Sequence, residues 1–515
     1  MREMMERLAR RLWWDRLPAT WLRDTRRMRR FVDEIEPTPP RHDGLAFGIV
    51  LAPWCGSAVP WFSLVVGLLL LARGHRVSLI VDNMPFGEPS RGWRFQLACI
   101  RAVLRRLRGR HAIVTLSNHA HGGPVLDDAA RRSIERLATL NVVWAQRGES
   151  TMPTGDVELL RRQLTASRGA IAGVMAAQRF DVLFVPGGVW GSSGLWVELA
   201  RAAGVRVASY DSGGYGMLLL AADGIACQLR DIPRAYALLQ ARCAGSAQER
   251  AFVVESARAE IEKRRAGTDK FASQVQGARP KDPRFAGGVL LALNSPWDSA
   301  ALGLHTVYSS TQKWIVETVR YLLEHTEAPV IVRQHPVERL EIARSSDDYR
   351  AMLVQHFGAH PRLHFVAAED PVNSYDLLEQ VATVVVYTST IGTEAAAHGK
   401  PVVTESSSYY AELGFVRQAT TETAYREHLS DAVAGRSQVT PAMRDDALAC
   451  YYLTQCCNWV YTPLNVPGFP EWSQRRFVDL AGEPSVRNVV RSLEENVPVA
   501  FLNHLARLEP PPCGT

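Results

Sequence analysis

The residues of this chain best suited to chemistry follow a short apolar run, Val330–Val332. Arg333 and His335 come directly after it, two positions apart, so an extended backbone would place both side chains on the same side. Pro336 fixes its own φ and favours an extended conformation at His335, which stiffens the end of the strand. Ligands of open α/β sheets lie outside the carboxyl ends of the strands, so this pattern indicates a binding site. A core or loop histidine is the alternative.

A second motif, VVVYTSTIGTEAAAHGKPVVTE at 384–405, favours a strand, a turn, a helix, a turn and another strand. Ser389 and Thr390 supply hydroxyl groups where the first strand ends, and Gly392 is expected to let the backbone turn sharply. The N–H groups and the positive dipole end of the following helix attract anions, most often phosphate. The pattern therefore predicts an anion site. An ordinary crossover with a Ser/Thr cap is the alternative.

Two features of the N-terminal half could serve an acceptor. Asp211 stands at the end of a predicted strand, beside Gly213, and we predict that it acts as a general base. A turn Asp that caps the next helix is the alternative. A Gly-rich loop after another strand is predicted to line an acceptor pocket, through Gly187, Gly188 and Trp190. It could equally be a plain turn.

One further loop follows the first strand of the C-terminal half. Its Asp298 and Ser299 are predicted donor contacts, since loops in this place usually touch a ligand. No DxD triplet occurs, and the eight cysteines show no zinc spacing. We therefore predict no metal and no cofactor besides the substrates.

The pairs His335-Pro336 and Ser389-Thr390 together resemble bacterial capsular-polysaccharide glycosyltransferases of the GT-B fold. That group includes bacterial sialyltransferases and Kdo transferases, which use CMP-activated sugars. The segment 211–213 stands where the family has an acidic-x-Gly motif, with one acid where the family usually has two. The resemblance implies an α/β fold with two Rossmann-like domains facing a central cleft, and C-terminal helices packing back across it. It is good over about 288–414 and looser in the N-terminal half.

This resemblance implies the roles of the motifs. The nucleotide sugar would lie on the second domain and the acceptor on the first. Displacement at an anomeric carbon needs a base, stabilisation of the departing phosphate, and positioning. Asp211 would be the base. Arg333 or His335 would neutralise the phosphate, and His335 could also act as a general acid. The pair Ser389-Thr390 would bind the phosphate, and Glu394 would bind the ribose unless it only complements the helix dipole.

The chain is too long, at 515 residues, for one hydrophobic core. We predict five regions: a basic segment at 1–40, an N-terminal Rossmann-like acceptor domain at 41–265, a linker at 266–287, a nucleotide-sugar domain at 288–415, and a helical region at 416–515. A run of about 15 apolar residues, 58–72, is predicted as a buried crossover helix, since it is short for a membrane span. Among the predicted strands of the N-terminal domain is Val142–Ala145.

Charge is concentrated at the N-terminus. Residues 1–30 hold ten Arg and four acidic residues, a net +6, which equals the net charge of the whole chain. Arg interleaved with Trp and Leu suits a helix lying on an anionic membrane surface, so we predict inner-membrane contact through residues 1–35. The alternative is an amphipathic helix packed on the body of the protein. We expect a cytoplasmic protein, no secretory signal and no nucleic-acid partner.

The leading hypothesis is an inverting transferase for surface polysaccharide assembly, with CMP-Kdo or CMP-sialic acid as the donors that the resemblance implies. Three alternatives stay open. A teichoic-acid-type polyol-phosphate transferase would usually carry an acid just after the Ser pair, and none is present. A nucleotide-sugar epimerase would be expected to lack the basic N-terminal segment. A non-catalytic partner in a capsule assembly complex would be expected to lose the two motifs.

Overall fold

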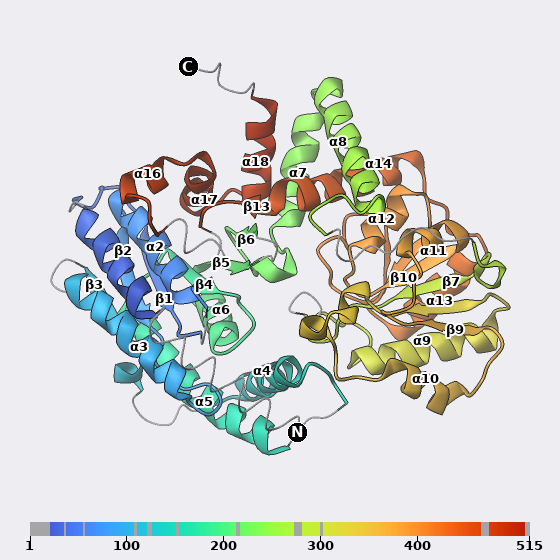
Figure 1. Cartoon of the computed structure of the whole chain (residues 1–515), viewed down its shortest axis with the longest axis horizontal. Helices are drawn as coiled ribbons and strands as arrows, with labels where there is room; N and C mark the ends of the chain where they lie inside the picture. The colour runs from blue at the N-terminus through green and yellow to red at the C-terminus, as the bar shows by residue number, and fades with distance from the viewer. Residues whose placement is uncertain are drawn as a thin grey trace. The chain divides into compact units, whose positions relative to one another are not determined.

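The computed structural model describes residues 21–35, 38–54, 57–107, 111–120, 126–150, 154–212, 217–271, 281–298, 302–464 and 473–509. The chain packs into two compact units, each built from three segments. Unit 1 comprises 1–138, 154–227 and 459–503, and unit 2 comprises 139–153, 228–458 and 504–515. Each unit holds a largely parallel sheet (Figure 1), so the predicted pair of α/β domains is confirmed.

Unit 1 contains a seven-stranded sheet in the order β13-β6-β5-β4-β1-β2-β3. Its strands are β1 (Ala46–Leu51), β2 (Arg76–Val81), β3 (Ala112–Thr115), β4 (Val182–Pro186), β5 (Arg206–Ser212), β6 (Met217–Ala221) and β13 (Val460–Tyr461). Its helices are the helix over 21–34, α2 (Val59–Ala72), α3 (Arg91–Leu104), α4 (Asp128–Gln146), α5 (Thr154–Ala177), α6 (Ser193–Ala202), α16 (Phe477–Gly482), α17 (Pro484–Glu495) and α18 (Val499–Leu508). The division between the two units falls within α4 and within α18, so each of these helices contributes to both units.

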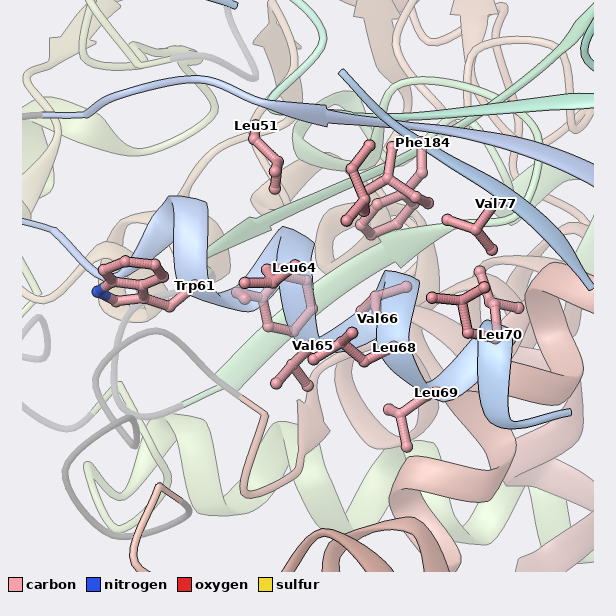
Figure 2. Close-up of a cluster of buried hydrophobic side chains, with 14 of the residues drawn as sticks. Leu51, Trp61, Leu64, Val65, Val66, Leu68, Leu69, Leu70, Val77 and Phe184 are labelled. Carbon is pink, nitrogen blue, oxygen red and sulfur yellow. The ribbon is translucent and has the colours of Figure 1, made fainter. Parts of the chain in front are cut away.

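The apolar run at 58–72 forms the first crossover helix, as predicted. Helix α2 is buried from Pro60 to Leu71 and packs against β1, β2 and β4. Figure 2 shows its Leu and Val side chains beside Leu51, Val77 and Phe184. Burial of each such side chain contributes roughly 1.5–3 kcal/mol. The run is apolar on every side because it is covered on every side.

Both ends of the chain contribute to the core of unit 1. In the helix over 21–34, Trp21 and Phe31 are buried, and the Trp21 ring lies 5.1 Å from that of Trp61. For residues 21–34 of the predicted membrane segment, the structure therefore shows the alternative, an amphipathic helix packed on the body of the protein. Residues 1–20 lie outside the described residues. Strand β13 pairs antiparallel with β6, and the C-terminal segment adds Leu464, Phe477, Leu480, Val486, Val489, Val490, Leu493 and Val499 to the same core.

Unit 2 contains a six-stranded sheet in the order β12-β11-β10-β7-β8-β9. Its strands are β7 (Val289–Ala292), β8 (Val330–Arg333), β9 (Leu363–Val366), β10 (Thr383–Val386), β11 (Val402–Thr404) and β12 (Arg417–Gln418). Its helices are α7 (Ile232–Cys243), α8 (Ala247–Arg265), α9 (Thr311–His325), α10 (Tyr349–Phe357), α11 (Ser374–Gln380), α12 (Ile391–Ala397), α13 (Glu422–Val433), α14 (Pro441–Tyr451) and a π-helix at Tyr452–Asn458.

Helices pack on this second sheet in two groups. Helices α9 and α13 pack on β8 and β11 and contact each other, and α10 packs on α9. Helix α12 packs on β10 and β11 and is covered by α14, which in turn packs on α7 and α8. Central strands such as Val384–Val386 are fully buried, as expected of a parallel sheet with helices on both faces. Helices α7 and α8, assigned from the sequence to the N-terminal domain, therefore pack in unit 2.

Two expectations about the elements differ from the structure. The predicted strand Val142–Ala145 is wrong, because these residues lie inside α4 and continue its helical pattern. The segment after Asp211 was expected to be helical, but β6 follows it and pairs antiparallel with β5. A short β-branched run such as the one within Val142–Ala145 fits either a strand or a helix, and the residues around it decided in favour of the helix.

Among the described residues, no helix combines the length and apolar character that crossing a bilayer requires.

Candidate donor site in unit 2

The loops that carry both motifs leave the same edge of the second sheet. Strand β7 lies between β8 and β10, all three parallel, so their carboxyl ends meet. The chain proceeds from β7 to β8 on one side and later returns to β10 on the other, which makes the β7–β10 boundary a topological switch point. Ligands of open α/β sheets bind in the crevice at such a point. The loop after β7 and the loop after β10 are joined there, since Thr388 N donates to Asn294 Oδ1 at 3.1 Å.

His335 caps a short 3₁₀ turn, Pro336–Arg339, that follows β8. Its φ of −61° and ψ of 126° are extended, as the Pro336 neighbour requires. The Val337 N–H donates to His335 Nδ1 at 3.2 Å. Nδ1 therefore carries a lone pair, and in the neutral ring the proton is on Nε2.

Burial lowers the pKa of His335 to about 4, and the nearby charges of Arg333 and Arg264 act in the same direction. The imidazole is therefore neutral at physiological pH, with Nε2–H as a hydrogen-bond donor. Such a group can stabilise a phosphate oxygen without a change in protonation. The lowered pKa suits a hydrogen-bond donor better than the predicted general acid, because a neutral imidazole gives up its proton reluctantly.

Arg333 is buried and supports the loop after β9. Its guanidinium group donates to the carbonyl oxygen of Ala367 and, at 3.0 Å, to that of Val372. Burial lowers the pKa of Arg333 to about 10, so the group keeps its charge at neutral pH. The structure thus places the charge of Arg333 near enough to lower the pKa of His335, but its side chain is directed to backbone carbonyls.

The Ser-Thr motif forms a turn at the start of α12. Thr390 is the N-cap residue but makes no side-chain capping bond, and Ser389 O accepts from Tyr410 Oη at 2.8 Å. Gly392 does not form the turn as expected. It lies within α12, and a Cβ there would approach the Tyr410 hydroxyl to 2.8 Å. Glycine is needed for this close packing.

Glu394 lies in a buried polar cluster, 2% exposed. Burial raises the pKa of its carboxyl group, while Arg264 and a hydrogen bond with Tyr375 lower it. Arg264 forms an ion pair with Asp269, donates to Gln455 Oε1 at 3.3 Å, and lies 4.2 Å from the Phe271 ring centroid. Sequence reasoning placed Arg264 at the domain boundary. Only the packing of α8 on α14 and of α14 on α12 brings it near the motifs.

The remaining predicted donor contacts lie in the loop after β7. Asp298 is exposed and its backbone N–H donates to Ser295 O at 3.1 Å in a turn. Ser299 lies outside the described residues. Sequence reasoning missed Asn294, whose amide oxygen binds the Ser-Thr turn. A polar residue at the end of the apolar run that forms β7 was the available signal.

Unit 1 has its own switch point, between β1 and β4. The loop after β4 contains Gly187 and Gly188 with φ of +67° and +94°, a backbone that favours glycine. Trp190 is buried at 5% exposure and therefore contributes packing. Asp211 lies in β5, opposite Leu219 of β6, and its Oδ1 accepts from Ser212 N at 2.7 Å. Gly213 lies outside the described residues.

Sequence reasoning missed a second carboxylate at this edge of the first sheet. Asp82 follows β2 and is 3% exposed. It accepts hydrogen bonds from the Ser192 hydroxyl, from Trp196 Nε1 at 3.2 Å and from Met84 N at 3.2 Å. Burial raises its pKa and these bonds lower it. With three donors, Asp82 holds the Gly187–Ser192 turn against β2.

The segment 249–456 matches the family model of capsule polysaccharide biosynthesis proteins. This match covers both motifs, lies entirely in unit 2 and spans about two fifths of the chain. It confirms the resemblance to capsule-type proteins. No curated protein matches the chain.

Similar solved structures include two from Thermosulfurimonas dismutans. The KpsC β-Kdo 2,4 transferase is 16% identical, with 52% of this chain and 79% of that chain covered and a TM-score of 0.36. The KpsC β-Kdo 2,7 transferase is also 16% identical, with 58% and 88% covered and a TM-score of 0.33. A UDP-N-acetylglucosamine 2-epimerase from Listeria monocytogenes is 10% identical, with 88% and 96% covered and a TM-score of 0.26. At these scores the likenesses carry no argument about activity.

Proposed function

We propose that this protein is a glycosyltransferase that moves a sugar from a nucleotide-activated donor to a glycan or lipid-linked acceptor in surface polysaccharide synthesis. The observation that carries the proposal is the position of the His335 turn and the Ser389-Thr390 turn at the same edge of the second sheet, after β8 and β10, the two strands that flank β7 at its switch point. The match of this same segment to capsule polysaccharide biosynthesis proteins supports it.

In this proposal the donor phosphate lies between the two turns. His335 Nε2–H and the Ser389 hydroxyl donate to its oxygens. Both residues are partly exposed, and the Val337 N–H on His335 Nδ1 leaves Nε2–H as the donor of the imidazole. The dipole of the turn and the fixed donors stabilise the charge that develops on the leaving phosphate. Glu394 binds the ribose, with Arg264 and Tyr375 holding its carboxyl group.

The acceptor is assigned to unit 1, as the resemblance of the motifs implies. Asp211 at the end of β5 takes the proton from the acceptor hydroxyl, which gives an inverting displacement. The resemblance of the motifs supports CMP-Kdo or CMP-sialic acid as the donor. The reaction as written needs no metal ion.

Nucleotide binding tests the proposal directly. We expect CMP to raise the melting temperature of the protein, in parallel titrations with CMP, CDP, UDP and GDP. His335→Ala and Ser389→Ala should each remove a donor to the phosphate and weaken binding about tenfold or more, the effect of losing a charge-assisted hydrogen bond. His356→Ala, an exposed histidine on α10, is the matched control and should bind as the unmodified protein does.

The outcomes separate the alternatives. Stabilisation by UDP or GDP in place of CMP would keep the site but overturn the donor class. Absence of any response would favour a non-catalytic partner in a capsule assembly complex.

We also propose that the protein contacts the inner face of the membrane through its basic N-terminal segment. The buried positions of Trp21 and Phe31 mean that residues 21–34 would contribute only their outward arginines, such as Arg23. Binding to vesicles should therefore depend on anionic lipid and fall with salt, as expected of electrostatic attachment. Co-sedimentation with vesicles with and without phosphatidylserine, at low and high salt, measures this. Equal binding to neutral vesicles would contradict it.

A further inference from the structure

Glu338 is a buried carboxyl group three residues after His335. It is 1% exposed and lies in the same 3₁₀ turn, where its own N–H donates to His335 O at 3.0 Å. Its Oε2 accepts from Gln334 Nε2 at 3.0 Å and from Ser345 N at 3.4 Å. One oxygen of this carboxyl group therefore links Gln334, the residue before His335, to Ser345 farther along the same loop.

The backbone and the side-chain oxygen of Gln334 are held by β9 and by the loop that follows it. Its Oε1 accepts from Ala368 N at 3.1 Å, and its backbone N–H donates to Val366 O at 3.0 Å. His335 is thus flanked by two side chains that bind each other and are anchored to the β9 loop. This arrangement fixes the backbone of the turn and, with it, the Val337 N–H that selects the tautomer of the imidazole.

The surroundings of the second oxygen of Glu338 indicate a connection between this residue and the loop after β7. Within the described residues, Glu338 Oε1 and Ser295 Oγ are both buried without a partner of hydrogen-bond geometry, yet Ser295 is close enough to lower the pKa of Glu338. Buried polar atoms without partners cost about 1–3 kcal/mol each, so such a pair calls for an explanation. Ser295 directly follows Asn294, which binds Thr388 N at the Ser-Thr turn.

We propose that Glu338 is a positioning residue of the donor site, which couples the turn carrying His335 to the turn carrying Ser389 through Ser295 and Asn294. The proposal rests on the proposed function in that both turns bind the donor phosphate. Glu338 itself touches no substrate. It acts by holding His335 Nε2–H and the Ser389 hydroxyl at a fixed separation.

The state of the carboxyl group agrees with this role. Burial raises the pKa of Glu338 to about 7, while the hydrogen bonds from Gln334 and Ser345 and the nearby Ser295 hydroxyl lower it. A sizeable share of the molecules therefore carries a proton on Glu338 at neutral pH, and that proton can be donated to Ser295 Oγ. Glutamine has the same shape and also offers a donor, so Glu338→Gln should preserve the coupling and Glu338→Ala should not.

The experiment combines two readouts on the full chain with ¹⁵N-labelled histidine, in which His335→Asn assigns the His335 signals. In Glu338→Ala we expect the ¹⁵N shifts of His335 to move from the Nε2–H pattern toward tautomer exchange, and CMP binding to weaken about tenfold. Glu338→Gln should restore both to within about threefold in affinity. Glu341→Ala, an exposed neighbour in the same loop, is the matched control.

Each outcome decides a separate point. Unchanged His335 shifts in a folded Glu338→Ala protein would overturn the inference. If that variant fails to fold, Ser295→Ala decides the matter, because it keeps the carboxyl group and removes only the link to the β7 loop; unchanged CMP affinity there would also overturn the coupling. If the unmodified protein binds none of CMP, CDP, UDP and GDP, the proposed function fails, while the His335 shifts still report on positioning.

Discussion

At the scale of single residues, His335 and Glu338 carry opposite pKa shifts in one turn. The pKa of His335 is lowered from 6.5 to about 4, so its contribution to stability is present above pH 6.5 and is lost as the pH falls toward 4. The pKa of Glu338 is raised from 4.5 to about 7, so its contribution is present below pH 4.5 and is lost as the pH rises through 7. The two effects oppose each other between pH 4.5 and 6.5.

Substitution should separate these two contributions. His335→Asn removes a group that resists protonation, so the variant should lose less stability than the unmodified protein between pH 6.5 and 4.5. One pKa unit corresponds to about 1.4 kcal/mol, which sets the difference at about 3 kcal/mol at most. Melting temperatures across this pH range measure it. Parallel pH profiles of the two proteins would contradict the lowered pKa of His335.

Glu338→Gln should reduce the loss of stability that the unmodified protein shows as the pH rises above 4.5. Because glutamine does not ionise, the variant should keep its stability as the pH rises from 4.5 to 7, where the unmodified protein loses some. The same melting series measures this, with the exposed Glu341→Gln as the control. A loss identical to that of the unmodified protein would mean that Glu338 ionises with an ordinary pKa.

At the scale of elements, the turn before α12 depends on a contact that the local sequence does not reveal. Tyr410 binds Ser389 O, and Gly392 leaves room for its ring and hydroxyl. A side chain at position 392 would displace Tyr410 and release the backbone of the Ser-Thr turn. The strand-turn-helix pattern was predictable, but this support comes from a residue 21 positions away from Ser389.

Gly392→Ala should therefore destabilise the protein and weaken nucleotide binding together. Overpacking of this kind costs about 1–3 kcal/mol. Tyr410→Phe should cost about 1 kcal/mol through the lost hydrogen bond. Gly155→Ala in α5 is the matched control, since a Cβ there meets nothing within 4 Å. Melting temperature and CMP affinity are the measurements, and a Gly392→Ala protein as stable as Gly155→Ala would contradict this packing.

At the scale of the whole molecule, each unit is assembled from segments far apart in the sequence. Residues 459–503 complete the core of unit 1, and α7 and α8 belong with unit 2. Within the predicted helical region at 416–515, α16 and α17 pack in unit 1. The predicted boundary at 265 does not coincide with this division, because α8 buries Val253, Ala257 and Ile261 within unit 2.

A charge placed in the C-terminal segment should therefore unfold a unit formed mainly by the N-terminal half. Val489 on α17 is fully buried in the core of unit 1, whereas Val478 on α16 is 63% exposed. Val489→Asp should cost about 4 kcal/mol or more, the range for an unpaired buried charge, and Val478→Asp close to nothing. Soluble yield and melting temperature compare the two variants. Equal behaviour would contradict the packing of α17 in this core.

The sequence by itself determined the local features of this protein. The apolar run at 58–72, the His335-Pro336 pair and the strand-turn-helix pattern at 384–405 each predict an element from neighbouring residues, and the structure contains those elements. Only the tertiary structure decided which side chains meet. Arg264 and Asn294 join the candidate donor site through contacts between distant segments, and such contacts leave no periodic signal in the chain. The same holds for Val142–Ala145, where the long helix around a β-branched run overrode its local preference.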